Sequence, residues 1–139
     1  MKKILSAFVV VLGLFMFVNQ DAGLAMGKRP HKAYLDVKTI SKEALSQKLQ
    51  NGEPVQVVDD LDPEYYKLGV IKGSLKIPLS ELDSRLGELD KSKEVVTYCA
   101  SYQCGASGEA AHKLGGLGFN VRAYEGGIKE WKSAGLPVE

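Results

Sequence analysis

The stretch from residue 95 to residue 111 constrains the fold more than any other part of the chain. It begins with Val95-Val96-Thr97-Tyr98, a run of β-branched and aromatic residues that is typical of a buried strand. After a loop that holds both cysteines it continues into Glu109-Ala110-Ala111, and Ser107 stands where a helix N-cap is expected. A strand that leads directly into a helix is the repeating unit of parallel sheets.

The same alternation extends over the rest of the chain. Turn and cap signals separate expected strands at residues 34–37, 54–59, 74–77, 94–98 and 120–124 from expected helices at 41–50, 62–69, 80–86, 107–117 and 128–134. A length of 139 residues with 45% hydrophobic content suits one domain with its own core. We therefore predict a single three-layer α/β domain: a mostly parallel five-stranded sheet with helices on both faces.

The N-terminus is predicted to be a targeting segment. Lys2 and Lys3 precede an apolar run over residues 4–18, and small residues then lead to Ala25. This pattern predicts a signal peptide over residues 1–25, a linker and first strand over 26–39, and the globular domain over 40–139. The run is shorter than the roughly 20 residues of a membrane helix, so an uncleaved anchor is the alternative interpretation. The predicted location is outside the cytoplasm, in the periplasm, where disulfides persist.

Charge and ligand composition exclude other classes of function. A formal net charge of +1 gives no electrostatic basis for binding nucleic acid or, beyond the leader, an anionic membrane. Two cysteines in one loop and two distant histidines, His31 and His112, do not form a metal-ligand set. We expect no metal and no other cofactor.

Cys99 is the candidate catalytic residue. It follows a predicted strand, so its thiol would face loop N–H groups and the positive end of the next helix, which favour the nucleophilic thiolate. Ligands of parallel sheets bind at the carboxyl ends of strands, where Asp59 and Asp60 also lie. Asp59 is a candidate for orienting the loop, whereas Asp60 is as readily a solvated turn acid. The competing interpretation of Cys99 is a buried structural thiol. The predicted substrate-binding residues are those of the loop, through their main-chain amides: Ala100, Ser101, Tyr102, Gln103, Cys104 and Gly105.

Cys104 has three interpretations. Four residues separate it from Cys99, and a looping segment of that length could bring the two sulfurs together, so it could be a resolving thiol that forms a reversible disulfide. It could also accept sulfur from Cys99, or take no part in the chemistry.

Five segments in order resemble the rhodanese-like (sulfurtransferase) family over about residues 40–138. They are the strand ending in Asp59, an E-Y-x-x-G-H-I-x-G-like segment at 64–73, Ile77-Pro78-Leu79, the strand leading to Cys99, and a G-G-x-x-x-W-x-x-A-G-x-P-V pattern at 126–138. The loop is similar to a C-x-x-x-x-C variant of that family. The resemblance implies that Cys99 accepts sulfane sulfur as a persulfide and passes it to cyanide, a thiol or a protein.

The loop departs from the family pattern in its charge. Relatives often carry arginine after the cysteine, whereas residues 100–108 here contain no cation. A cysteine phosphatase needs such an arginine to hold phosphoryl oxygens, so phosphatase chemistry is disfavoured. Thiosulfate is expected to bind weakly, and a persulfide or polysulfide donor fits better. The predicted function is an exported sulfurtransferase acting between a small sulfur donor and a thiol or cyanide acceptor; a non-catalytic sulfur-carrier or protein-interaction module and a Cys99/Cys104 dithiol redox protein are the alternatives.

Overall fold

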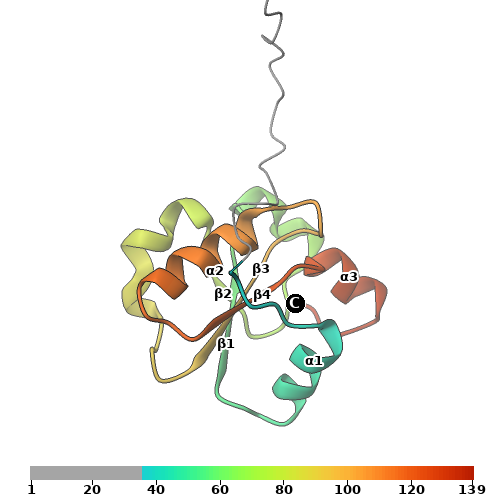
Figure 1. Ribbon diagram of the computed structural model, residues 1–139. Helices are drawn as coiled ribbons and strands as arrows, with labels where there is room; N and C mark the ends of the chain where they lie inside the picture. Colours follow the sequence, from blue (N-terminus) through green and yellow to red (C-terminus); the bar gives the residue numbers. More distant parts are fainter. Residues whose placement is uncertain (1–35) are drawn as a thin grey trace, which may run out of the picture.

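A parallel sheet forms the centre of the protein. The computed structural model describes residues 36–139, in which four strands pair in the order β2-β1-β3-β4 (Figure 1). The strands are β1 (Val55–Asp59), β2 (Leu75–Lys76), β3 (Glu94–Tyr98) and β4 (Val121–Tyr124), and every pair among them is parallel. The predicted α/β architecture is confirmed.

Two layers of helices cover the two faces of the sheet. On one face, α1 (Lys42–Gln50) and α3 (Gly127–Ser133) pack Leu45, Ile128 and Trp131 against the strands. On the other, α2 (Ala106–Gly116) and η3 (Leu79–Glu88) contribute Ala110, Leu114 and Leu82. A short helix, η2 (Pro63–Leu68), follows β1. The helices thus bury both apolar faces of the sheet, as is usual for parallel sheets.

The sheet has four strands and not the predicted five. Thr39 forms a single parallel bridge to Ala123, with Lys38 and Ile40 supplying the two hydrogen bonds, so this segment meets the β4 edge over one residue only. The strand expected at residues 34–37 begins outside the described residues, and Asp36 and Val37 are not in a strand. The predicted signal peptide and most of the linker also lie outside the described residues. Within residues 36–139, the helices are too short or too polar to cross a membrane.

Helix starts follow the local sequence with one exception. Ser41 caps α1 as predicted, because its hydroxyl accepts from the Ala44 N–H at 3.2 Å. The prediction that Ser107 caps α2 was wrong: Gly105 is the N-cap, and Ser107 lies inside the first turn with 1% of its surface exposed. The predicted helices at 62–69 and 80–86 are present as the 3₁₀-type η2 and η3.

Candidate active site

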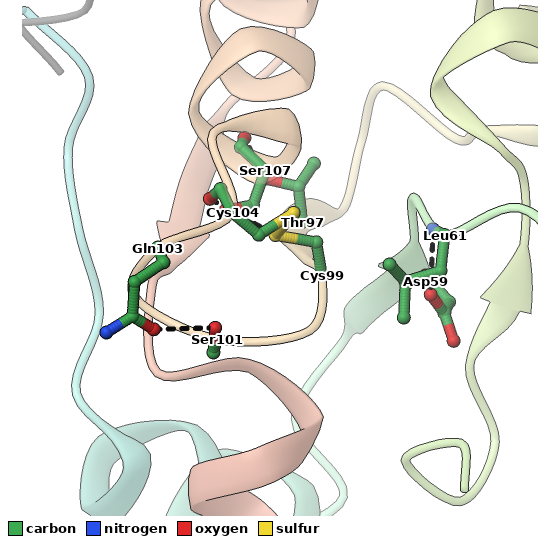
Figure 2. Close-up of a disulfide and its surroundings, with 8 residues drawn as sticks. All are labelled: Asp59, Leu61, Thr97, Cys99, Ser101, Gln103, Cys104 and Ser107. Atoms are coloured by element: carbon green, nitrogen blue, oxygen red, sulfur yellow. Dashed lines mark hydrogen bonds between the residues drawn. A yellow bond between two sulfur atoms is a disulfide. The ribbon is translucent and has the colours of Figure 1, made fainter. Parts of the chain in front are cut away.

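The two cysteines are joined to each other. Cys99 follows the last residue of β3, Cys104 precedes the N-cap of α2, and a disulfide connects them across the loop, with Cα atoms 6.3 Å apart (Figure 2). The prediction that this loop can bring the sulfurs together is confirmed. In this state Cys99 is not a free nucleophile, and reduction is required before it can attack a donor.

Cys99 is enclosed between the end of β3 and the first turn of α2. Its residue surface is fully buried, and its Sγ lies 3.8 Å from the Ser107 hydroxyl and 3.3 Å from the Cys104 carbonyl oxygen. Thr97 Oγ1 donates to the Ser107 carbonyl oxygen at 2.8 Å, which fixes the helix start against the strand. The sequence predicts a capping role for Ser107, yet its side chain faces the Cys99 sulfur.

The N-terminus of α3 holds the start of the loop. The Ile128 N–H donates to the Cys99 carbonyl oxygen at 2.9 Å, and the Lys129 N–H donates to that of Ala100 at 3.0 Å. Gly127 has φ +64°, and a Cβ there would collide with the Cys99 carbonyl oxygen. The predicted role of the glycine pair, a tight turn with close packing, is therefore confirmed at Gly127.

The remaining loop residues form a small turn. The Cys104 N–H donates to the Ser101 carbonyl oxygen at 2.9 Å, so this amide is used by the loop itself. The Ser101 hydroxyl donates to Gln103 Oε1 at 2.9 Å, away from the disulfide (Figure 2). Tyr102 is 53% exposed, and its hydroxyl donates to Glu130 on α3 at 3.2 Å. Substrate binding by the amides of residues 100–105 stays a prediction.

Asp59 lies at the end of β1 and is linked to the start of the loop through Tyr98. It is fully buried, its Oδ1 accepts from the Leu61 N–H at 3.0 Å, and its Oδ2 accepts from the Tyr98 hydroxyl at 2.9 Å. Burial raises the pKa of Asp59, and these hydrogen bonds oppose the rise. Tyr98 directly precedes Cys99, so Asp59 helps to fix the end of β3.

Asp60 is buried and has no hydrogen-bond partner on its carboxyl group. It is 3% exposed, and neither of its side-chain oxygens is paired within the described part of the chain. Burial, followed by the nearby charge of Asp59, raises the pKa of Asp60 well above its ordinary value. The interpretation of Asp60 as a solvated turn acid was wrong, because the chain continues between β3 and η3 before it reaches the surface: the Asp60 N–H donates to Tyr98 and its carbonyl oxygen accepts from Leu79.

Metal binding finds no support in the geometry of the described residues. Within residues 36–139 no three His, Cys, Asp or Glu side chains are placed to hold a metal ion. The chemistry that the described residues offer at this site is that of the two sulfurs.

Several known proteins are similar to this chain, and some of them are named for sulfur chemistry. A sulfurtransferase from Allochromatium vinosum is 36% identical over 104 residues, covering 73% of this chain and 94% of its own. An HTH-type transcriptional regulator from Mycobacterium tuberculosis is 35% identical over 100 residues, and there the chain spans only 44% of the relative's length. The crystal structure of a rhodanese-related protein from Thermoplasma volcanium superposes with a TM-score of 0.65 at 30% identity, covering 73% of this chain and 97% of that one. The family model described as "Rhodanese-like domain" matches residues 41–134, and the chain belongs to the rhodanese-like family.

Proposed function

We propose that this protein is a sulfurtransferase in which Cys99 carries the transferred sulfur as a persulfide. The observation that carries the proposal is the position of Cys99, at the carboxyl end of the central strand β3 and against the first turn of α2. Helix N-termini favour anions, so the reduced thiol is placed where its thiolate, and later the persulfide anion, is stabilised. Sulfurtransferase relatives with this domain support the reaction class.

The reaction has two steps. The Cys99 thiolate attacks the outer sulfur of a donor R–S–S⁻, the Cys99 Sγ–S bond forms, and R–S⁻ leaves with the electron pair of the broken S–S bond. An acceptor thiolate or cyanide then attacks the outer sulfur of the persulfide and regenerates the Cys99 thiolate. The missing cations of residues 100–108 favour a persulfide or polysulfide donor over thiosulfate.

Mass spectrometry of the reduced protein tests this proposal. After treatment with an inorganic polysulfide, wild type and Cys104→Ser should gain one sulfur atom and transfer it to added thiol or cyanide with turnover, whereas Cys99→Ser should not. An adduct without turnover would instead support a sulfur carrier. An adduct that depends on Cys104 and survives in Cys99→Ser would overturn the assignment.

The disulfide favours a second candidate, a dithiol redox protein. Cys99 and Cys104 form the bond without help from another chain, and Cys104 is partly exposed, so an external thiol can reach it. In that function the oxidised protein would oxidise a partner dithiol to a disulfide, and its own Cys99–Cys104 disulfide would be reduced to the dithiol. Equilibration with glutathione mixtures distinguishes the two: a redox protein cycles between dithiol and disulfide with no sulfur adduct, and both cysteines are needed.

We propose further that the protein acts outside the cytoplasm after removal of residues 1–25. The predicted leader supports this, since an exported domain meets oxidants that maintain the disulfide. The mass of the protein recovered from a periplasmic fraction tests it: a chain beginning at Met26 is expected, and a full-length chain in the membrane fraction would favour the anchor.

A further inference from the structure

The main chain around the two cysteines is held by hydrogen bonds that do not involve the disulfide. The Cys99 carbonyl oxygen accepts from the Ile128 N–H of α3 at 2.9 Å, and the Cys104 N–H donates to the Ser101 carbonyl oxygen at 2.9 Å. Gly105, the residue after Cys104, is the N-cap of α2. Both ends of the loop are therefore anchored when the S–S bond is broken, and the two sulfurs stay within reach of each other.

The loop directs Cys104 Sγ to Cys99 Sγ. The disulfide joins these two atoms, with the Cα atoms 6.3 Å apart (Figure 2). When Cys99 carries a transferred sulfur, its Sγ is the inner sulfur of the persulfide. The atom that the Cys104 thiol reaches is thus the inner sulfur, and attack there expels the outer one as HS⁻. Hydrogen sulfide is a stronger acid than a cysteine thiol, so HS⁻ is a good leaving group.

Proximity favours Cys104 over an acceptor from solution. Cys99 is fully buried, so an external acceptor must enter the loop before it meets the sulfur that Cys99 carries. Cys104 lies in the same loop at a sequence separation of 5. A thiol tethered in this way has an effective concentration on the order of millimolar or higher. Acceptors at lower concentration therefore lose the competition with Cys104.

The two sulfurs of the disulfide differ in access. Cys99 is fully buried, whereas Cys104 is partly exposed. An incoming thiolate therefore attacks Cys104 Sγ, and the electron pair of the broken bond goes to Cys99 Sγ. Reduction thus returns the nucleophile to the first turn of α2, where Cys99 Sγ lies 3.8 Å from the Ser107 hydroxyl and anions are favoured.

We propose that Cys104 resolves the Cys99 persulfide, so that the protein reduces sulfane sulfur to hydrogen sulfide. The Cys104 thiol gives up its proton and attacks Cys99 Sγ. The Sγ–Sγ bond forms, the bond between Cys99 Sγ and the outer sulfur breaks, and the outer sulfur leaves with the bonding electrons and the proton as HS⁻. The two cysteines are oxidised to the disulfide, and the sulfane sulfur gains their two electrons.

A dithiol reductant completes the cycle. One of its thiolates attacks Cys104 Sγ and releases Cys99, its second thiol then releases Cys104 from the mixed disulfide, and the reductant leaves as a disulfide. No external sulfur acceptor takes part, which distinguishes this activity from sulfur transfer. The activity rests on the proposed persulfide of Cys99.

A single turnover without an acceptor tests the proposal. Reduced protein, freed of its reductant, is mixed under exclusion of oxygen with less than one equivalent of glutathione persulfide, and the sulfide released and the protein mass are followed. The wild-type adduct should decay at least about 100-fold faster than that of Cys104→Ser, with one sulfide released for each disulfide formed. Cys104→Ser should keep the added sulfur over the same time.

A variant with a displaced thiol is the matched control. Gln103→Cys combined with Cys104→Ser keeps two cysteines in the loop but moves the second to an exposed side chain that bonds Ser101, away from Cys99 (Figure 2). Its adduct should persist as in Cys104→Ser. Sulfide release at the wild-type rate would show that any thiol in the loop suffices, and would overturn the assignment to Cys104.

The other outcomes separate this proposal from the function on which it rests. A long-lived adduct on wild-type Cys99 overturns the role of Cys104 alone, and that measurement needs no variant. Added sulfur found on Cys104 of wild type, located by peptide fragmentation, overturns it as well, because the attack would then be on the outer sulfur. If neither wild type nor Cys104→Ser gains sulfur and no sulfide appears, the proposed function of Cys99 is itself refuted.

Discussion

The buried hydroxyl of Tyr98 donates a hydrogen bond of 2.9 Å to Asp59 Oδ2 and accepts one of 3.0 Å from the Ile71 N–H. One side chain thereby joins the ends of β1 and β3 to the turn before β2, and Cys99 is the next residue along the chain. Burial and the charge of Asp59 both raise the pKa of Tyr98, so the phenol keeps its proton and remains a donor.

Tyr98→Phe should therefore destabilise the fold. It leaves the Asp59 oxygen and the Ile71 N–H buried without a partner, which costs about 1–3 kcal/mol. Urea unfolding of the oxidised protein measures the loss. Tyr65→Phe removes a hydroxyl from a side chain that is 42% exposed and serves as the control, with no measurable change expected. Equal stabilities for the two variants would show that the hydrogen bonds of Tyr98 contribute nothing net.

Replacement of Gly127 by alanine is predicted to destabilise the protein strongly. Gly127→Ala should cost the strain of a positive φ, about 1–2 kcal/mol, plus roughly 1–3 kcal/mol for the collision with the Cys99 carbonyl oxygen. Gly135→Ala isolates the first contribution, because Gly135 has φ +69° with no atom within 4 Å of a Cβ. Thermal unfolding of both variants compares their stabilities. If Gly127→Ala is as stable as Gly135→Ala, α3 can move away from the loop without loss of stability.

The sequence predicts well what depends on local patterns. Cys99 at a strand end, Ser41 as a cap and the glycine turn before α3 all follow from short-range signals, and the structure has each of them. What it misses depends on contacts between segments distant in the chain. Ser107 looks like a cap because Ser favours caps, but the turn closed by Cys104 starts the helix two residues earlier and brings Ser107 to the sulfur.

The burial of the charged residue Asp60 is likewise not predictable from the local sequence. Two successive acids at the end of a strand are a common pattern of exposed turns, and no signal in the sequence marks one as buried. Its burial follows from the pairing of its main chain with Tyr98 on one side and Leu79 on the other, which only the assembled sheet supplies.

Reduction of the disulfide should lower the stability of the wild-type protein. The bond closes a short loop with a sequence separation of 5, and the chain-entropy relation gives about 2 kcal/mol for a loop of this size. Urea unfolding with and without a phosphine reductant measures the difference, and Cys104→Ser should show none. A reduced protein as stable as the oxidised one would mean that strain in the folded loop offsets the cross-link.

Asp60→Asn should gain stability relative to wild type as the pH rises. The folded-state pKa of Asp60 lies above the ordinary value of 3.8, so the folded protein holds a proton that the unfolded chain releases. Wild type therefore loses stability with rising pH above about 4, whereas the amide does not titrate. The difference in free energy of unfolding between variant and wild type, measured from pH 3 to pH 8, should grow across this range. A constant difference would show that Asp60 titrates alike in the folded and unfolded chain.

A cation placed in the loop should change the choice of sulfur donor. Residues 100–108 present no cation, so thiosulfate, a dianion, can rely only on main-chain amides and the start of α2. Gln103 is exposed, and its side chain bonds only Ser101 among the described residues, so Gln103→Arg adds charge at little structural cost. A charged hydrogen bond contributes about 1.5–3 kcal/mol, which predicts a rise in kcat/KM for thiosulfate of tenfold or more. Gln103→Leu is the uncharged control, and its kcat/KM for thiosulfate should stay within twofold of the wild-type value. Rapid thiosulfate turnover by the wild-type protein, unchanged by the arginine, would show that the amides and the helix N-terminus suffice for an anionic donor.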